Sequence, residues 1–282
     1  MLIVGGGAVG ACIALELSRR GVSTSLIERE RELGRGCSAG NMGLICPGHS
    51  APLATPENLV VGLRYMFRPD GPLYLRPRPA MAGWLARYLW ACRPANAAAG
   101  VRVMREISEL SLRLHAELAS EGLNETFVRR GTLSLCETEA GLEALRAEAR
   151  GHSAGGLEAR LLDGGEARDL EPSLGRHVRG AVFYPNEAHC DSLSFVQAVG
   201  RAAAEAGADV RTGVEVLALR RRSGRVEGVD STEGTVRAGT VVLAGGSWSG
   251  ALASTAGAFV PVQGGKGYHV EIDTGGGDPV IP

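Results

Sequence analysis

The feature that most constrains this chain is its opening unit, residues 1–28, which reads MLIVGGGAVGACIALELSRRGVSTSLIE. An apolar run is followed by three glycines at the spacing G-x-G-x-x-G, an amphipathic run, a second apolar run and a carboxylate. This order predicts a short buried strand over residues 2–4, a helix that begins at the glycines, and a parallel strand over 22–27 that ends at Glu28. The chain is therefore expected to begin with a β-α-β unit.

Each part of this unit has a mechanical role. Gly5 permits a tight turn, Gly7 lets the backbone approach a diphosphate, and Gly10 lets the helix pack against its strand. The N–H groups and the positive dipole end of the helix attract phosphates. Glu28 stands where a carboxylate accepts hydrogen bonds from ribose hydroxyls and repels a 2′-phosphate. The unit therefore favours FAD or NAD over NADP, and a glycine-rich loop without a ligand is the alternative.

Composition sets the broad class of protein. A chain of 282 residues with 44% hydrophobic residues is long enough for two domains, or for one domain with a large insertion. A net charge of −1 gives no reason to expect nucleic acid as a partner. The six cysteines form no C-x-x-C pair, which favours thiols in a reducing cytoplasm. Because the first strand begins at Met1, we expect no secretory signal.

The longest apolar runs do not predict a membrane span. Arginines interrupt both of them, at residues 59–69 and 81–92. Trp84, Tyr88 and Trp90 stand close to arginines, a composition that suits the surface of a bilayer. A peripheral contact with the inner face of the membrane and an amphipathic helix packed on its own domain are both consistent with this segment.

The remaining sequence predicts an α/β fold in which a Rossmann-like domain is interrupted by a second domain. Residues 1–56 are its first part and end in an ordered loop rich in Gly, Ser and Pro. Residues 57–187 lose the strand and glycine pattern and predict an inserted α+β domain. Residues 188–260 return to the first domain, and 261–282 begin a return to the insert.

Within the insert, the pattern predicts a long helix marked by Ile107, Leu110, Leu114 and Leu118, whose spacings are three and four. Strands are predicted at RRGTLSLCET and GAVFYPN, with a helix at EAGLEALRAEAR between them. After the insert we expect a helix over 192–206, several short strands, and an apolar strand over 240–244 that runs into two glycines.

Five segments together resemble the flavin-dependent D-amino-acid dehydrogenases of the D-amino-acid oxidase superfamily. They are CSAGNMGLICPGHSAPLATP, RRGTLSL, GAVFYPNEAHCDSLSF, VVLAGGSWS and PVQGGKGYHVEI, and the resemblance extends over nearly the whole chain. It implies a Rossmann-like FAD-binding domain of the GR2 type with an inserted substrate domain. It also implies noncovalent FAD and hydride transfer from a D-amino acid to the flavin, with the resulting imine hydrolysed to a 2-oxo acid and ammonia.

The resemblance also implies roles for single residues. Glu28 would meet the adenosine ribose, and the backbone of Val216 would meet adenine. His49 stands where family members often have tyrosine, which leaves the substrate preference open. Tyr268 is a second candidate substrate contact, because alternation along a strand would place it on one face with Val270 and Ile272. The cofactor-binding residues so implied are Gly5, Gly7, Ala8, Val9, Gly10, Glu28, Arg29, Ser38, Asn41, Gly43, Leu44, Val216, Ala244 and Gly245.

One departure from the family concerns the reactive end of the site. Family members continue past the position of Pro282 with segments of the type G-x-R-x-x-T-P-D-G and T-G-H-G-x-x-G, which line the isoalloxazine ring. Neither segment occurs here, and the arginine that clamps the substrate carboxylate tends to lie in that portion too. The sequence is therefore expected to be a truncated product, a part of a longer protein, or one subunit of a split enzyme.

Three functions remain open from the sequence. The first is a flavoenzyme that oxidises D-amino acids, with either quinone or oxygen as the electron acceptor. The second is a related amine oxidoreductase that acts on hydroxyproline, sarcosine or glycine. The third is a non-catalytic FAD-binding fragment that needs a partner chain. We expect no metal site, because His177, His189 and Cys190 match no common ligand spacing.

Overall fold

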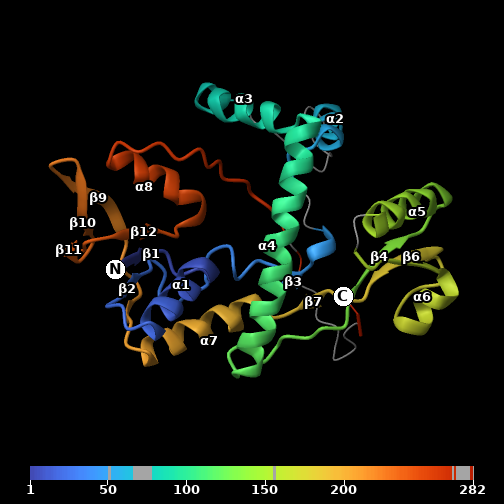
Figure 1. The fold of residues 1–282 in the computed structure, drawn as a ribbon, viewed down its shortest axis with the longest axis horizontal. Coiled ribbons are helices and arrows are strands. Elements are labelled where there is room, and N and C mark those ends of the chain that lie inside the picture. The colour runs from blue at the N-terminus through green and yellow to red at the C-terminus, as the bar shows by residue number, and fades with distance from the viewer. Residues whose placement is uncertain (50–51, 66–77, 155–156, 269, 271–279, 282) are drawn as a thin grey trace.

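The computed structural model describes residues 1–49, 52–65, 78–154, 157–268, 270 and 280–281. The elements formed by residues 1–27 and 192–255 lie on one side of the molecule, and an antiparallel sheet with α5 and α6 lies on the other (Figure 1). The long helix α4 (Pro94–Ser120) stands between these two groups. This arrangement is the α/β fold with an inserted α+β region that the sequence predicts.

A parallel sheet of four strands carries the opening unit. Its order is β12-β1-β2-β8, so β1 lies between β12 and β2. Helix α1 (Ala8–Arg19) connects β1 to β2 and packs against α7 (Ser192–Glu205). The predicted β-α-β unit is confirmed, although its second strand begins later than expected, at Ser25. The strands are β1 (Leu2–Val4), β2 (Ser25–Ile27), β8 (Asp209–Arg211) and β12 (Val241–Leu243).

The parallel sheet is buried on both faces, which explains why its strands are continuous apolar runs. Ile3 and Leu26 point to one face and pack with the apolar side of α1 and α7, including Leu15 and Val196. Leu2, Val4 and Ile27 point to the other face, as alternation along a strand requires. Burial on both sides fixes the register of β1 and so fixes the turn that follows it.

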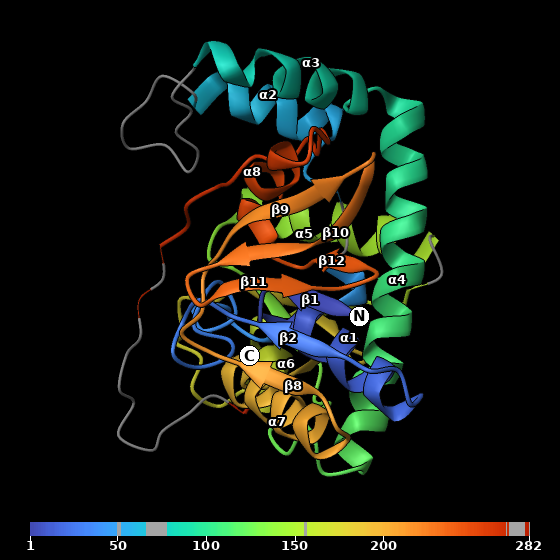
Figure 2. The ribbon, with the colours of Figure 1, turned by 90° about the vertical axis from the view of Figure 1, so that its left-hand side faces the viewer.

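A second sheet covers the other face of the parallel sheet. It is an antiparallel meander of order β11-β10-β9. Figure 2 shows both sheets viewed from the left-hand side of Figure 1. Ser223 and Gly224, with φ of 49° and 83°, form the tight turn between the first two strands. Its strands are β9 (Val216–Arg222), β10 (Arg225–Ser231) and β11 (Gly234–Arg237), and η3 (Gly246–Trp248) and α8 (Ser249–Thr255) follow β12.

The inserted region has its own antiparallel sheet, of order β4-β6-β5. Two of its strands and helix α5 fall where the sequence predicts them, whereas β5 and α6 are not predicted. Asp163 begins α6 with a capping box, in which its carboxylate accepts from the N–H groups of Gly165 and Glu166. The elements are β4 (Thr132–Cys136), α5 (Glu139–Ala154), β5 (Arg160–Asp163), α6 (Gly164–Leu170) and β6 (Gly180–Tyr184).

Short elements join the two regions. Strand β3 (Leu44–Ile45) lies in the loop after β2 and pairs with β7 (Ala188–His189), which follows the insert. This pairing draws the loop toward the start of α7. The other elements are η1 (Pro47–His49), α2 (Pro56–Tyr65), η2 (Pro79–Met81) and α3 (Ala82–Ala91). The domain limits at residues 56, 187 and 260 remain predictions.

The strand predicted around Tyr268 is absent, which corrects the sequence analysis. The described residues from 258 to 268 belong to no helix or strand, and Tyr268 is 87% exposed. A strand needs a neighbour to pair its N–H and C=O groups, and none lies beside this segment among the described residues. Val270 is also exposed, and Ile272 lies outside the described residues.

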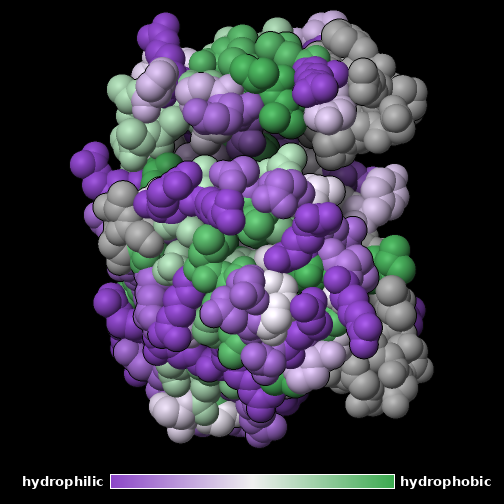
Figure 3. All heavy atoms as spheres, turned by 90° about the vertical axis from the view of Figure 1, so that its right-hand side faces the viewer, coloured by the Kyte–Doolittle hydropathy of each residue, from purple (hydrophilic) through white to green (hydrophobic). Residues whose placement is uncertain are grey.

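Helices α2 and α3 form an apolar end of the molecule. Figure 3 shows hydrophobic side chains gathered there, above a mostly hydrophilic body. Its large exposed residues are Val60, Val61 and Leu63 of α2 and Leu89 and Trp90 of α3, and we call them the α2–α3 surface. Among the described helices, none combines the length and the apolar character needed to cross a bilayer.

The close packing of α1 on β1 gives a stability prediction. A Cβ atom at Gly10 would lie 1.8 Å from the carbonyl oxygen of Gly5, so Gly10→Ala forces the helix away from the turn. We expect it to reduce the free energy of unfolding by about 2–3 kcal/mol, measured by urea denaturation.

Gly151→Ala is the matched control. Gly151 lies in α5, and a Cβ atom there would meet nothing within 4 Å. Replacing a glycine in a helix by alanine should then raise stability by about 0.5–1 kcal/mol. Equal effects of the two substitutions would contradict the proposed packing.

Candidate cofactor-binding site

A cleft of about 470 Å³ opens where β12, β1 and β2 end. In open sheets of this kind, ligands bind outside the carboxyl ends of the parallel strands. Five segments line the cleft: the turn after β1, the residues after β2, the following loop, the start of β9, and the residues after β12. The predicted site residues in its wall are Gly5, Gly7, Ala8, Val9, Glu28, Arg29, Ser38, Val216, Ala244 and Gly245.

The glycine turn brings three backbone segments into contact. Gly5 has a φ of +109°, and a Cβ atom there would lie 2.6 Å from the carbonyl oxygen of Ala244. Gly7 differs, since a Cβ atom there would meet only the hydroxyl of Ser38, at 3.6 Å. Gly7 is also the N-cap of α1 and provides no side-chain cap. The first N–H groups of α1 therefore lie at the cleft with room for a bulky acceptor.

Glu28 lies at the mouth of this turn. Its Oε2 accepts a hydrogen bond from the Gly6 N–H at 2.5 Å, and its Oε1 accepts one from the Glu30 N–H at 2.9 Å. Because each carboxylate oxygen has two lone pairs, each can accept a further hydrogen bond. The two backbone contacts therefore hold the carboxylate in place without using up its capacity for a pair of vicinal hydroxyls.

Arg29 and Trp248 form a wall of the cleft. The guanidinium carbon of Arg29 lies 4.0 Å from the centre of the Trp248 ring, the geometry of a cation–π contact. Arg29 follows β2 and Trp248 follows β12, so their contact spans the end of β1. Arg29 was predicted from the sequence as a cofactor-binding residue, whereas Trp248 was not. Trp248 stands two positions after Gly246, the second of the glycines that end the buried strand, and this proximity is a signal that could have found it.

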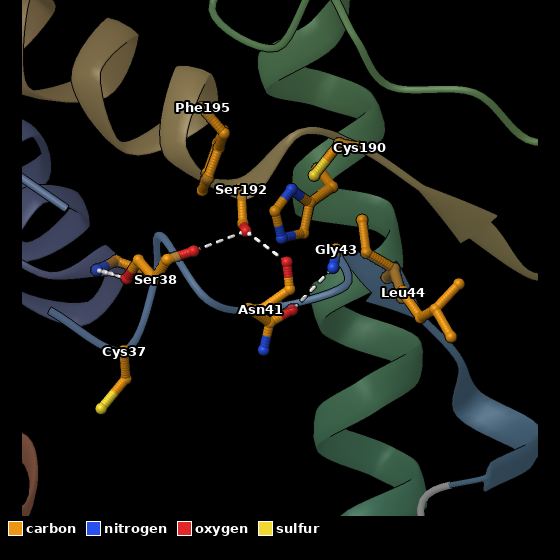
Figure 4. Close-up of a pocket in the computed structure, with 11 residues that line it drawn as sticks. Cys37, Ser38, Asn41, Gly43, Leu44, Cys190, Ser192 and Phe195 are labelled. Carbon is orange, nitrogen blue, oxygen red and sulfur yellow. Dashed lines mark hydrogen bonds between the residues drawn. The ribbon is translucent and has the colours of Figure 1, made fainter. Parts of the chain in front are cut away.

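The loop after β2 is fixed by contacts with α7 and β7. Ser192 at the start of α7 donates to the carbonyl oxygen of Ser38 at 2.7 Å, and Asn41 Oδ1 accepts from the Gly43 N–H at 2.7 Å (Figure 4). Gly43 has a φ of +70°, and a Cβ atom there would lie 1.8 Å from the carbonyl oxygen of Cys190. The glycine is therefore required at this position for steric reasons.

The far end of the loop is tied to the insert by a buried carboxylate. Glu187 is 2% exposed and accepts hydrogen bonds from the Gly48 N–H at 2.9 Å and from the Thr132 hydroxyl. Burial raises the pKa of the nearby Cys46 thiol to about 12, and the Glu187 carboxylate adds to the effect. Cys46 is therefore a neutral thiol at physiological pH.

A smaller cavity of about 250 Å³ adjoins the cleft. The two share Ala8, Cys37 and Ser38, so they meet beside the first turn of α1. The smaller cavity brings together three further predicted residues, Asn41, Gly43 and Leu44 (Figure 4). Its other wall residues are Ile45, His115, Cys190, Ser192 and Phe195. His115 was not predicted, because its helix was read only for its apolar spacing.

Three predicted residues line neither space. Gly10 lies behind Gly5, where it lets α1 pack closely on the turn and does not face the cleft. His49 ends η1, and its side chain is outside the described part of the structure. Tyr268 is exposed, and the Lys266 ammonium lies 5.1 Å from its ring centre. The structure therefore gives no support to a pocket wall made by Tyr268.

The fold and the cleft define a nucleotide-binding α/β protein, and comparisons identify its family. The family model described as FAD dependent oxidoreductase matches residues 1–281. A D-amino acid dehydrogenase of Cereibacter sphaeroides is 33% identical over 278 residues, which are 96% of this chain and 64% of that protein. A D-amino acid dehydrogenase of Sinorhizobium medicae is 31% identical over 278 residues, 96% of this chain and 67% of that protein.

Solved structures show the same fold. Glycine oxidase from Bacillus cereus superposes with a TM-score of 0.65 at 24% identity, covering 90% of this chain and 56% of that one. L-proline dehydrogenase from P. horikoshii gives a TM-score of 0.62 at 22% identity, covering 91% and 55%. The chain thus spans about two thirds or less of the length of these proteins. It belongs to the FAD-dependent oxidoreductase family of the D-amino-acid oxidase type.

The residues of the cleft fit FAD. The open face of Gly7 leaves room for a diphosphate beside the N–H groups of α1, and the Glu28 carboxylate has lone pairs for ribose hydroxyls. Val216 and Trp248 provide apolar surface for a flat ring. The cofactor prediction of the sequence is therefore supported by the geometry as well as by the family.

The position of Glu28 gives a binding prediction. Glu28→Gln removes the charge that strengthens hydrogen bonds from the ribose, and hydrogen bonds to charged groups contribute about 1.5–3 kcal/mol. We expect ADP affinity, measured by calorimetry on the apoprotein, to fall about tenfold or more.

Glu32→Gln is the matched control, because Glu32 is in the same loop but pairs with the exposed Arg35 and lies outside the cleft wall. ADP affinity should be unchanged in this variant. A Glu28→Gln protein that folds normally and binds ADP as tightly as the wild type would show that Glu28 does not contact the ribose.

Proposed function

We propose that this chain binds FAD and takes part in the oxidation of D-amino acids to 2-oxo acids and ammonia. The observation that carries the proposal is the arrangement around one cleft of Glu28 and the first turn of α1, where the N-cap residue Gly7 gives no side-chain cap. The D-amino acid dehydrogenases to which the chain is similar support the choice of substrate class. When bound, FAD would supply the group that accepts a hydride.

The contribution of the described residues is binding and orientation. The amides at Gly7 and Ala8 would hold the diphosphate, and Glu28 would fix the ribose. The Ala8 N–H makes only a long contact of 3.4 Å with the Ser38 hydroxyl, which a phosphate oxygen would replace. Arg29 and Trp248 would enclose the adenine end, which keeps water from that part of the cleft. The loop from Ser38 to Leu44, held by α7 and β7, would position the other half of the cofactor. An enzyme of this kind requires the cofactor-binding residues to place the reactive group of the cofactor accurately.

Two other functions remain as candidates. One is an oxidoreductase that acts on small amines or imino acids, suggested by the similarity in fold to a glycine oxidase and an L-proline dehydrogenase. An FAD-binding chain that works only with a partner chain is the other candidate, since the exposed Tyr268 lines neither the cleft nor the smaller cavity.

The substrate class is tested by anaerobic reduction of the FAD-loaded protein. We expect loss of flavin absorbance with one or more D-amino acids, and little change with the L-enantiomers, sarcosine, hydroxyproline or glycine. Reduction by sarcosine, hydroxyproline or glycine alone would favour the related amine oxidoreductases. A protein that binds FAD but is reduced by none of these compounds would favour the candidate that needs a partner chain.

We also propose that the α2–α3 surface contacts a membrane. Trp90 is 58% exposed and Leu63 is 56% exposed, and aromatic and aliphatic side chains of this kind enter the surface of a bilayer. The double substitution Leu63→Ser and Trp90→Ser should reduce sedimentation with anionic vesicles by at least about half. The control is Leu135→Ser, an exposed leucine of β4 outside this surface. Equal sedimentation of all three proteins would contradict a contact through α2 and α3.

A further inference from the structure

His115 is held in a fixed orientation in the wall of the smaller cavity. It comes from α4, whereas the facing wall comes from the loop after β2 and from α7. Its ring centre lies 4.6 Å from that of Phe195, tilted by 47°, and it is nearly parallel to the ring of Phe127 at 6.5 Å. Two aromatic contacts therefore limit the rotation of the imidazole.

Asn124 determines which ring nitrogen of His115 carries the proton. Asn124 is 2% exposed, and its Nδ2 lies 3.0 Å from Nδ1 of His115. Since an amide nitrogen only donates, Nδ1 must accept, and the proton is assigned to Nε2. Burial lowers the pKa of His115, so the neutral ring is favoured near neutral pH.

The surroundings of the Asn124 Oδ1 atom, which offer no hydrogen-bond partner, support this assignment of the amide. Burial raises the pKa of the Cys190 thiol, and a hydrogen bond from the Asn124 side chain opposes that effect. The Nδ2 group has two hydrogens, one for His115 and one for the sulfur of Cys190. With the amide reversed, its nitrogen would occupy the place of Oδ1, which has no hydrogen-bond partner.

Most other polar groups in this cavity already have partners. The Ser192 hydroxyl donates to the Ser38 carbonyl oxygen, and Asn41 Oδ1 accepts from the Gly43 N–H. The Ser38 hydroxyl accepts a long hydrogen bond from the Ala8 N–H at 3.4 Å. No described residue accepts a hydrogen bond from Nε2 of His115. The Nε2–H group of His115 is thus a hydrogen-bond donor with a fixed orientation, in a cavity with largely apolar walls.

The smaller cavity continues from the cleft past the first turn of α1. A ligand whose diphosphate lies at Gly7 and Ala8, with its ribose at Glu28, would extend its other half toward the loop from Ser38 to Leu44. We propose that His115 is a positioning residue that donates a hydrogen bond from Nε2 to an oxygen on the flavin-bearing half of FAD. The proposal rests on the proposed function, because it requires that FAD binds in the cleft.

The test compares FAD with ADP, because ADP contains only the half of the cofactor that the cleft would hold. His115→Phe keeps an aromatic ring beside Phe195 but removes the donor. We expect FAD affinity to fall about three- to tenfold, the usual effect of one neutral hydrogen bond, while ADP affinity stays within about twofold. Titrations of the apoprotein measure both affinities without any turnover.

His115→Gln is the matched variant. A glutamine can accept from Asn124 with its oxygen and donate with its nitrogen, as the histidine does. It should retain FAD affinity within about twofold of the wild type. Equal FAD losses in the two variants, no loss in either, or a parallel loss of ADP affinity in His115→Phe would each overturn the proposal.

A measurement on the unsubstituted protein covers the case in which His115→Phe does not fold. Nitrogen NMR of ring-labelled histidine should show the Nε2–H form of His115 and a shift of its Nε2 signal with FAD but not with ADP. An unchanged signal with saturating FAD would overturn the role of His115. Failure to bind either nucleotide is a different result, because it would refute the proposed function itself.

Discussion

The structure depends on the close approach of backbone segments at the end of β1. Ala244 donates its N–H to the carbonyl oxygen of Val4 at 2.8 Å, and Gly5 donates to that of Ile27 at 2.9 Å. The turn is thereby joined to both neighbouring strands before the helix begins. Any side chain at Gly5 or Gly10 would separate these segments. The position of α1, and with it the position of the cleft, follows from this contact.

The same contact arranges the charges of the cleft. It places the positive end of α1 near the Glu28 carboxylate, which is held by backbone N–H groups on both oxygens. The Glu28 carboxylate, with lone pairs remaining, can accept hydrogen bonds from ribose hydroxyls and would repel a 2′-phosphate on that ribose. The neighbouring N–H groups of α1 favour phosphate oxygens instead. One short turn therefore distinguishes the sugar of a dinucleotide from its diphosphate.

Much of the fold could be predicted because its signals are local. The opening strand, turn and helix depend on residues adjacent in sequence, as do β4, α5 and β6 of the insert. The insert also shows where local signals fail. Ile107, Leu110 and Leu114 correctly predict α4, yet these residues are 57%, 46% and 46% exposed, and Leu112 is buried instead. Periodicity predicts a helix, but the partners of each face depend on the tertiary arrangement.

The site was predicted unevenly for a similar reason. Residues of the glycine turn and Glu28 belong to a compact motif, so their positions followed from spacing. His115 reaches the site from a distant element, and nothing next to it in the sequence marks a role. Trp248 stands close to the glycines that end β12, but its contact with Arg29 depends on the tertiary arrangement. Tyr268 was assigned to a strand that has no neighbour among the described residues. An alternating pattern of side chains is compatible with a strand, but it does not show whether another strand lies beside it.

The central claim is that the turn after β1 and the Glu28 carboxylate together hold the adenosine diphosphate half of FAD. A crystal structure of the protein grown with ADP tests it most directly. The diphosphate should lie against the N–H groups at Gly7 and Ala8, with ribose hydroxyls within hydrogen-bond distance of Glu28. ADP bound elsewhere, or bound in the cleft with its ribose out of reach of Glu28, would contradict the account.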